Sequence, residues 1–472
     1  MSADELESIR RRLRGRGYDL SSLAIIAVFL FLLWRIRASL PVFSDSWYHL
    51  GVIRAFAERG ISLDAWWEFA PFGRPHLYPP LFHLAGVAMR QLTGADWLGI
   101  ARGFEVVTFP LVLAAGWGAA RSWFGARAAW LTLLLLAINF GLVFPCSLIL
   151  MPGTYAVLAW PFMLRLLLRK KWFWAGLLLA VMGYLHFGVA GVAVVSLILL
   201  ALFRREFLMP GLFALLAAGA LFSPWLAHLG RHREFLQSGV ARLPIFIPVF
   251  TLIAAGIGAV SARRNPTNES RAVLCMILAS ALFLFTLTER FWTYGGFLFA
   301  ILGGYGLDRW PAARVRVAMA VLVVSALSVT PFLKPARMRL AVPIPLAEAR
   351  WIMAAPFLAF ANWPRTEAVS ADLAALGQWI TEHVDRDEVL LTDDRLLGAS
   401  LFVLTGRRTT SGLWSEIMTA ELKEKLAHHY RTASGYIVVD RDKSDPASLA
   451  GQATFVVAFG KYAVYHRADS WN

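Results

Sequence analysis

The sequence predicts an α-helical polytopic membrane protein with about eleven spans and a small α/β domain at its C-terminal end. Of its 472 residues, 58% are hydrophobic and only 16% are charged. Soluble domains average about 45–50% apolar and about 25% charged residues. The mean hydropathy is +0.57. Long apolar runs fill residues 20–333, whereas residues 369–472 carry the shorter patterns of a soluble domain.

The basic balance of the chain does not indicate a nucleic-acid partner. The formal net charge is +15, but Lys and Arg gather between apolar runs, where they set the orientation of membrane spans. The two cysteines, Cys146 and Cys275, lie far apart in apolar surroundings. So few cysteines support neither a disulfide framework nor a zinc site. Membrane lipid is therefore the first partner that the composition predicts.

Apolar run length divides the chain into domains. Residues 1–19 form a polar, Arg-rich arm that we expect in the cytoplasm, and residues 20–333 form the transmembrane domain. A span needs roughly 20 mostly apolar residues. The candidate spans, several of them short, cover residues 20–40, 98–120, 128–145, 154–168, 172–186, 187–203, 207–225, 244–261, 271–288, 291–308 and 313–333.

Tyr78–Met89 is too short for a span, and we expect an interfacial or re-entrant helix there. Leaving it out places the N-terminal arm and five successive basic loops on the cytoplasmic side, as the positive-inside rule requires. The first outer loop then runs over residues 41–97. Eleven spans put the C-terminal end outside the cytoplasmic membrane.

Beyond the spans, residues 334–368 read as an interfacial linker and residues 369–472 as an extracytoplasmic α/β domain. Helical spacing of apolar residues marks ADLAALGQWITEHV, LLGASLFVLTG and AELKEKLAHHY as helices, the second closed by Gly406. Short apolar runs mark EVLLTD, GYIVVD, TFVVAFG and YAVYH as strands. This alternation predicts a compact α/β fold.

The strongest candidate for chemistry is Asp45, at the start of the outer loop and followed by Tyr48 and His49. A carboxylate at this edge can take a proton from a hydroxyl or hold a divalent metal. On a helix, His49 shares a face with Asp45, four residues earlier. The structural alternative is that Asp45 caps the following helix, a common role for Asp.

Several aromatic and His residues are further candidates. His76, Tyr78 and His83 flank the YPP turn and read either as part of a substrate platform or as interfacial anchors. His186 lies where two predicted spans meet on the outer side, and Tyr155 follows PGT at the outer end of another. Each has a structural alternative, since a lone polar residue between apolar helices is often a satisfied packing residue.

Glu289 and Arg290 lie together at the outer end of a predicted helical pair, in TLTERFWTYGG. The guanidinium fork of Arg binds two oxygens of a phosphate and never loses its charge. The alternative is an interfacial Arg that extends to the membrane surface beside its neighbouring Glu.

The order of these segments resembles the GT-C superfamily of membrane glycosyltransferases, which includes oligosaccharyltransferase catalytic subunits, protein O-mannosyltransferases and lipid A aminoarabinose transferases. SDSWYHLGVIRAFAERG is similar to the family segment after the first span, with Asp45 at the acidic position. YPPLFHLAG is similar to a Pro-Pro element of the same loop. ERFWTYGGFLFAILGGYGL resembles the late span whose Arg, here Arg290, contacts lipid phosphate. LGQWITEHVDRDEVLLTD resembles the start of the outer C-terminal domain.

The resemblance implies an inverting glycosyltransferase of the cell envelope, with a polyprenyl-phosphate sugar donor and a glycan, lipid or protein acceptor. Asp45 would be the catalytic base with His49 beside it, and Arg290 and His186 would bind the donor phosphate. Two family features are missing: FPCSLILMPGTY carries no second acidic pair, and the Trp-Trp-Asp motif is absent. No metal is therefore expected; if Mg or Mn is used, Asp45 is its ligand. The rival hypotheses are a non-catalytic scaffold on the same fold and a transporter, although the paired half-sequences of transporters are not seen.

Overall fold

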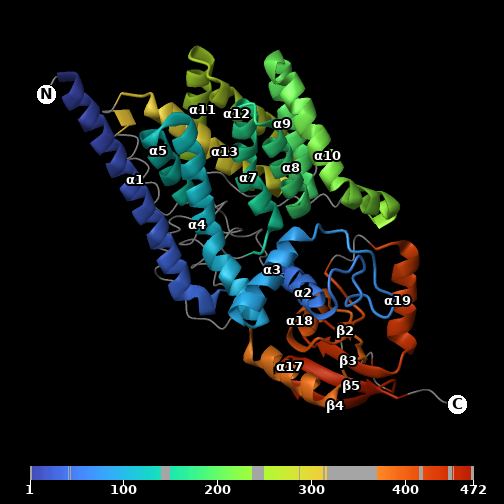
Figure 1. The fold of residues 1–472 in the computed structure, drawn as a ribbon. Helices are drawn as coiled ribbons and strands as arrows, with labels where there is room; N and C mark the ends of the chain where they lie inside the picture. The colour runs from blue at the N-terminus through green and yellow to red at the C-terminus, as the bar shows by residue number, and fades with distance from the viewer. Residues whose placement is uncertain are drawn as a thin grey trace. The chain divides into compact units, whose positions relative to one another are not determined.

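The computed structural model divides the chain into two compact units (Figure 1). It describes residues 3–40, 42, 44–139, 149–235, 249–285, 288–311, 314–315, 369–413, 418–444, 449 and 451–468. The first unit, here called the helical unit, comprises Met1–Ser39, Phe104–Ser223 and Val240–Arg365. The second, here called the mixed unit, comprises Leu40–Gly103, Pro224–Gly239 and Thr366–Asn472.

The helical unit is built from long apolar helices. Its elements are α1 (Ala3–Ile36), η1 (Arg37–Ser39), α4 (Trp97–Phe124), α5 (Ala126–Ala137), α7 (Pro152–Leu168), α8 (Trp172–Leu185), α9 (Phe187–Phe203), η2 (Arg205–Phe207), α10 (Leu208–Arg231), α11 (Val249–Arg264), α12 (Asn268–Ser280), η4 (Ala281–Phe285) and α13 (Thr288–Asp308). The first residues of α4 and the last of α10 belong to the mixed unit.

Ten of the eleven predicted spans coincide with these helices. The eleventh, residues 313–333, lies outside the described residues except for 314–315, as do the linker at 334–368 and residues 140–145 of the span predicted at 128–145. Among the described helices, three are long and apolar enough to cross a membrane by length and composition: Leu13–Ser39, Trp97–Phe124 and Arg205–Arg231. The others are shorter apolar helices. The fold is that of a polytopic α-helical membrane protein.

Glycines allow the helices around α13 to approach closely. α13 packs against both α11 and α5. A Cβ at Gly258 of α11 would overlap the Leu302 carbonyl of α13, and a Cβ at Gly304 would overlap the Thr132 hydroxyl of α5. Because a larger residue at either position would overlap the neighbouring helix, glycine is what allows these helices to pack so closely.

The mixed unit combines helices from the first outer loop with the C-terminal α/β elements. Its elements are α2 (Ser44–Arg59), α3 (Leu81–Thr93), η3 (Arg233–Phe235), α17 (Ala371–His383), β1 (Val389–Leu390), α18 (Arg395–Thr405), β2 (Arg408–Thr409), α19 (Ala420–Thr432), β3 (Gly435–Asp440), β4 (Thr454–Phe459) and β5 (Tyr462–Arg467). The predicted C-terminal helices and strands are all present. Gly406 ends α18 with a φ of 77°, a conformation that glycine adopts without strain.

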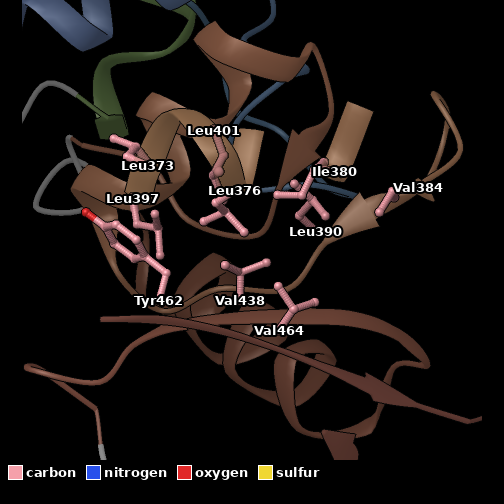
Figure 2. Close-up of a cluster of buried hydrophobic side chains, with 10 residues drawn as sticks. All are labelled: Leu373, Leu376, Ile380, Val384, Leu390, Leu397, Leu401, Val438, Tyr462 and Val464. Atoms are coloured by element: carbon pink, nitrogen blue, oxygen red, sulfur yellow. The ribbon is translucent and has the colours of Figure 1, made fainter. Parts of the chain in front are cut away.

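The C-terminal strands form two ladders that a single bridge connects. β1 pairs with β2 in parallel, and β5 lies between β3 and β4 with antiparallel pairing on both sides. Leu391, directly after β1, bridges in parallel to Ile437 of β3. The resulting order is β2-β1-β3-β5-β4. Figure 2 shows the buried cluster in which Leu376 and Leu401 of the helices meet Val438 and Val464 of the strands.

The first outer loop adds to this sheet. Trp67 O accepts a hydrogen bond from Thr409 N at 3.0 Å, and Ala70 N donates to Thr409 O at 2.9 Å. The Trp67 ring stacks on Phe402 of α18, with centroids 4.8 Å apart. The segment around Trp67 therefore lies along the free side of β2, and the outer loop shares a core with the α/β domain.

Candidate active site

Helix α2 carries the three candidates nearest to the first span. The helix begins at Ser44, so Asp45 lies within its first turn rather than at the capping position. A carboxylate in the first turn is favoured by the helix dipole. Asp45 is partly exposed, whereas Tyr48 and His49, one turn further on, are buried. The structure therefore gives Asp45 access to the surface of the mixed unit and places two buried side chains behind it.

Three of the predicted histidines gather beneath this turn. His49 Nδ1 and His83 Nε2 lie 3.0 Å apart in a buried hydrogen bond. The ring of His76 lies 5.7 Å from that of His83, measured between centroids. Tyr78 contacts His49 edge to face at 4.9 Å. The YPP turn, which leads into α3, thus packs these side chains against α2.

Burial determines the charge of this histidine cluster. It lowers the pKa of His83 to about 3 and lowers the pKa of His76 well below its usual value, because a charged ring in an apolar site loses its hydration. Burial also raises the pKa of Tyr48 to about 12. At neutral pH the rings of His83 and His76 are therefore uncharged, so they act as hydrogen-bond partners and not as cations toward a phosphate.

A buried ion pair lies in the same loop and was not anticipated from the sequence. Arg74 Nη2 and Glu68 Oε1 lie 2.6 Å apart, with side-chain exposures of 1% and 0%. Gly412 lies so close that a Cβ there would overlap Glu68 Oε2. Glu68 raises the pKa of Arg74 against the opposing effect of burial. The two residues lie in WEFAPFGRPH, which forms neither a helix nor a regular strand, so no periodic pattern predicts the pair.

His228, in the segment Pro224–Gly239 of the mixed unit, also contacts the YPP region. Its Nε2 donates a hydrogen bond to the His76 carbonyl at 2.8 Å. The ring is buried and also contacts Trp225. This histidine therefore holds the chain before the YPP turn.

The remaining candidates lie at helix ends in the helical unit. Tyr155, in the first turn of α7, shares a 2.5 Å hydrogen bond between its hydroxyl and Thr108 Oγ1. His186 is the N-cap of α9, where its Nδ1 accepts a hydrogen bond from Val189 N at 3.3 Å. Glu289 and Arg290 lie in the first turn of α13, and their side chains are outside the described part of the structure.

The described residues do not assemble a metal site. No group of three or more His, Cys, Asp or Glu side chains among them is arranged to hold a metal ion. His49 lies near Asp45 in sequence, but its Nδ1 is engaged by His83. Residues 140–148, which include the first five residues of the segment without a second acidic pair, are not described. We therefore assign no step of the chemistry to a metal.

Comparison with solved structures identifies the fold. The chain superposes on ArnT from Cupriavidus metallidurans bound to undecaprenyl phosphate with a TM-score of 0.65 and 16% identity, over 96% of this chain and 98% of that one. For the apo oligosaccharyltransferase from Archaeoglobus fulgidus, the TM-score is 0.62 with 11% identity, over 96% of this chain and 75% of that one. For mycobacterial arabinofuranosyltransferase AftD, the TM-score is 0.63 with 15% identity, over 95% of this chain and 40% of that one.

These structural neighbours are GT-C glycosyltransferases, and the chain has the GT-C fold. No protein-family model and no curated protein sequence matches it. The resemblance drawn from the sequence is confirmed at the level of the fold.

Proposed function

We propose that the protein transfers a sugar from a polyprenyl-phosphate-linked donor to an acceptor at the extracytoplasmic face of the plasma membrane. The fold supports this, because it extends over nearly the whole of an ArnT chain that binds undecaprenyl phosphate. An archaeal oligosaccharyltransferase of the same fold binds dolichol phosphate together with an inhibitory peptide. The observation that carries the proposal is the partly exposed carboxylate of Asp45 in the first turn of α2, with the buried pair of His49 and His83 behind it.

In the proposed reaction, Asp45 takes the proton of an acceptor hydroxyl and becomes a neutral carboxylic acid. The hydroxyl oxygen attacks the anomeric carbon from the side opposite the phosphate. The bond between that carbon and the phosphate oxygen breaks, its electron pair leaves with the lipid phosphate, and the anomeric configuration inverts. Arg290 offsets the charge that develops on the departing phosphate, which makes it a better leaving group. No metal ion is needed for this balance of charge.

The two proposed histidines have different parts in this scheme. Since His186 Nδ1 accepts a hydrogen bond from Val189 N, the proton of its neutral ring resides on Nε2, which can donate to a phosphate oxygen. His49 is held by His83 and positions the acceptor beside Asp45. Tyr48, His76, Tyr78 and His83 form the wall behind that acceptor, and Tyr155 and Glu289 lie at the ends of helices in the helical unit.

The proposed arrangement in the membrane follows from charge. The basic loops place the N-terminal arm, residues 1–19, in the cytoplasm. The transmembrane domain at 20–333 then presents its outer loop 41–97 to the other side, and the linker 334–368 leads to the extracytoplasmic domain 369–472. Donor phosphate, acceptor and Asp45 would then all meet at the outer face.

Sugar transfer in membranes that contain the wild type, Asp45→Asn or Arg290→Ala tests the proposal. A panel of polyprenyl-phosphate sugars serves as donors, with and without a chelator. We expect transfer by the wild type, a loss of about 10²–10⁴-fold in Asp45→Asn, as is typical of a missing general base, and a raised donor KM in Arg290→Ala. Asp442→Asn, which changes an exposed carboxylate, is the matched control. Full activity of Asp45→Asn, or no turnover of any donor, would reject the proposal.

A further inference from the structure

Two adjoining clefts lie on the mixed unit, apart from the histidine cluster. The larger has a volume of about 630 Å³, and the smaller has a volume of about 300 Å³. Trp66 and Arg408 line both of them, so the two clefts meet at these side chains. We call the pair the Trp66 groove. Its combined size suits a small oligosaccharide better than a single ion or an extended protein segment.

The smaller cleft is rich in guanidinium groups. Arg59, Arg386 and Arg408 line it. Glu58, the nearest carboxylate, is already held by Arg54 Nε at 2.7 Å, and Arg386 reaches it only at 4.0 Å. The proximity of Arg386 contributes to lowering the pKa of Arg54, although burial of Arg54 is the larger cause. This crowding of cations favours an anionic occupant.

Asp387, the other acidic residue of the smaller cleft, does not neutralise these arginines. Arg408 donates to the backbone carbonyl of Asp387 at 2.6 Å, not to its carboxylate. Arg59 stacks on Trp66, with its guanidinium carbon 3.7 Å from the ring centroid. Within the described part of the chain, no carboxylate forms an ion pair with Arg59 or Arg408. Stacking orders Arg59 while leaving its N–H groups able to bind oxygens in the plane of the guanidinium.

The larger cleft offers a different chemistry. Its lining includes the exposed Asp64 and the exposed pair Lys425–Glu421, whose charged atoms lie 2.6 Å apart. Phe72 adds an apolar face that is 48% exposed. A lining that both donates and accepts hydrogen bonds beside an aromatic face suits the hydroxyl groups and apolar ring faces of sugars. An apolar lipid chain would leave these charged groups unsatisfied.

We propose that the Trp66 groove binds the acceptor as an anionic saccharide, with its phosphate or carboxylate among the three arginines and its sugar rings in the larger cleft. This rests on the proposed function, because it names the acceptor class of that reaction. Planar guanidinium groups bind both carboxylates and phosphates through paired hydrogen bonds. The groove thereby selects acceptors by charge and holds one end of the acceptor, whose reacting hydroxyl lies beside Asp45 on the same unit.

Direct binding tests this inference independently of turnover. The full-length protein is placed in nanodiscs of neutral lipid, and ligand-observed NMR measures the Kd of a neutral hexose, its 6-phosphate, its uronic acid and inorganic phosphate. We expect both anionic sugars to bind about tenfold more tightly than the neutral hexose, as charge-assisted hydrogen bonds predict. Inorganic phosphate should bind about tenfold more weakly than the sugar phosphate, because it lacks the ring contacts.

Matched arginine variants locate the site. Arg59→Gln and Arg386→Gln change exposed side chains, so the fold should persist, as an unchanged Tm would verify. Each should weaken binding of the sugar phosphate by about 5–10-fold, the typical effect of one lost charge-assisted bond. Arg431→Gln, an exposed arginine of α19 outside the groove, should change it by less than about twofold.

Three outcomes would overturn the inference: equal affinity for neutral and anionic hexoses, inorganic phosphate binding as tightly as the sugar phosphate, or groove variants that behave like Arg431→Gln. Competition by vesicles with anionic headgroups but not by sugar phosphate would also reject it, because it would identify a lipid site. Failure of the proposed function is a separate result. If anionic sugars bind the groove but no donor is turned over, the inference about the groove stands and the proposed function is rejected.

Discussion

His49 Nδ1 and His83 Nε2 share one buried hydrogen bond, 3.0 Å long, between helices α2 and α3. Only one of the two nitrogens can carry the proton of that bond, so the tautomer of one ring dictates the tautomer of the other. If His49 donates, its Nε2 is left without a proton and accepts hydrogen bonds from its surroundings. The pair thus connects the orientation of α2, which carries Asp45, to the YPP turn.

The first prediction concerns stability at low pH. The pKa of His83 is about 3 in the folded protein, compared with 6.5 for an unperturbed His. Below pH 6.5 the unfolded chain binds a proton that the folded chain does not, so stability is complete above pH 6.5 and falls as the pH drops toward 3. The expected slope from His83 is about 1.4 kcal/mol per pH unit, and His76 acts in the same direction. Thermal unfolding from pH 7 to pH 4 measures it.

His83→Gln separates this effect from general acid sensitivity. Gln retains a hydrogen-bonding side chain but does not titrate, so the Tm of the variant should depend less steeply on pH than that of the wild type. His383→Gln, which alters an exposed histidine of α17, should leave the slope unchanged. Parallel pH profiles for wild type and His83→Gln would show that His83 does not have the lowered pKa.

The second prediction concerns the buried pair of Glu68 and Arg74. Glu68→Gln removes the negative charge and leaves the Arg74 guanidinium buried without a counterion, at a cost of about 3–5 kcal/mol. The double variant Glu68→Met, Arg74→Met should recover much of this loss, because no charge then remains in the site. Denaturant unfolding of the wild type, Glu68→Met, Arg74→Met and the double variant completes a double-mutant cycle, which gives the coupling energy.

Glu421 provides the comparison for this cycle. Its carboxylate lies 2.6 Å from Lys425 Nζ, the same separation as in the buried pair, but both side chains are exposed. Glu421→Gln should leave the midpoint of unfolding unchanged, because water screens and solvates an exposed pair. Equal effects of Glu68→Gln and Glu421→Gln would show that burial does not control the strength of these interactions.

The third prediction concerns the contact between the outer loop and α18. Phe402→Ala removes the ring on which Trp67 stacks, and we expect a loss of about 3–5 kcal/mol. The segment around Trp67 should then detach from β2 and become sensitive to limited proteolysis. Phe455→Ala, in β4 and 55% exposed, should have little effect on either measurement. If Phe402→Ala is cleaved no faster than the wild type, the two backbone hydrogen bonds to Thr409 are sufficient to hold the segment against β2.

Much of the fold can be predicted because its signals are local. Apolar run length located the helices of the helical unit, and helical spacing located α17, α18 and α19. The end of α18 follows from Gly406 alone, and its start from Asp394, whose side chain accepts hydrogen bonds from Leu396 N and Leu397 N. Each of these features depends on residues within a few positions of one another, so a single sequence contains the necessary information.

The candidate site is less predictable because its contacts join distant segments. His49 and His83 are 34 positions apart, and Arg54 Nη1 donates to the Val403 carbonyl across 349 positions. The residue types of His49 and His83 mark them as candidates, but neither their hydrogen bond nor the Glu68–Arg74 pair has a periodic signature. These two pairs form when the outer loop folds on itself, and Arg54 meets Val403 when that loop packs against the α/β domain.

The fourth prediction separates the roles of Asp45 and His49. If Asp45 is the base, Asp45→Asn should lower kcat by about 10²–10⁴-fold, whereas Asp45→Glu, which keeps the carboxylate, should retain measurable transfer. His49→Gln preserves a hydrogen-bonding partner for His83, so it should change KM for the acceptor more than kcat. If kcat falls as far in His49→Gln as in Asp45→Asn, the role of base passes from Asp45 to His49.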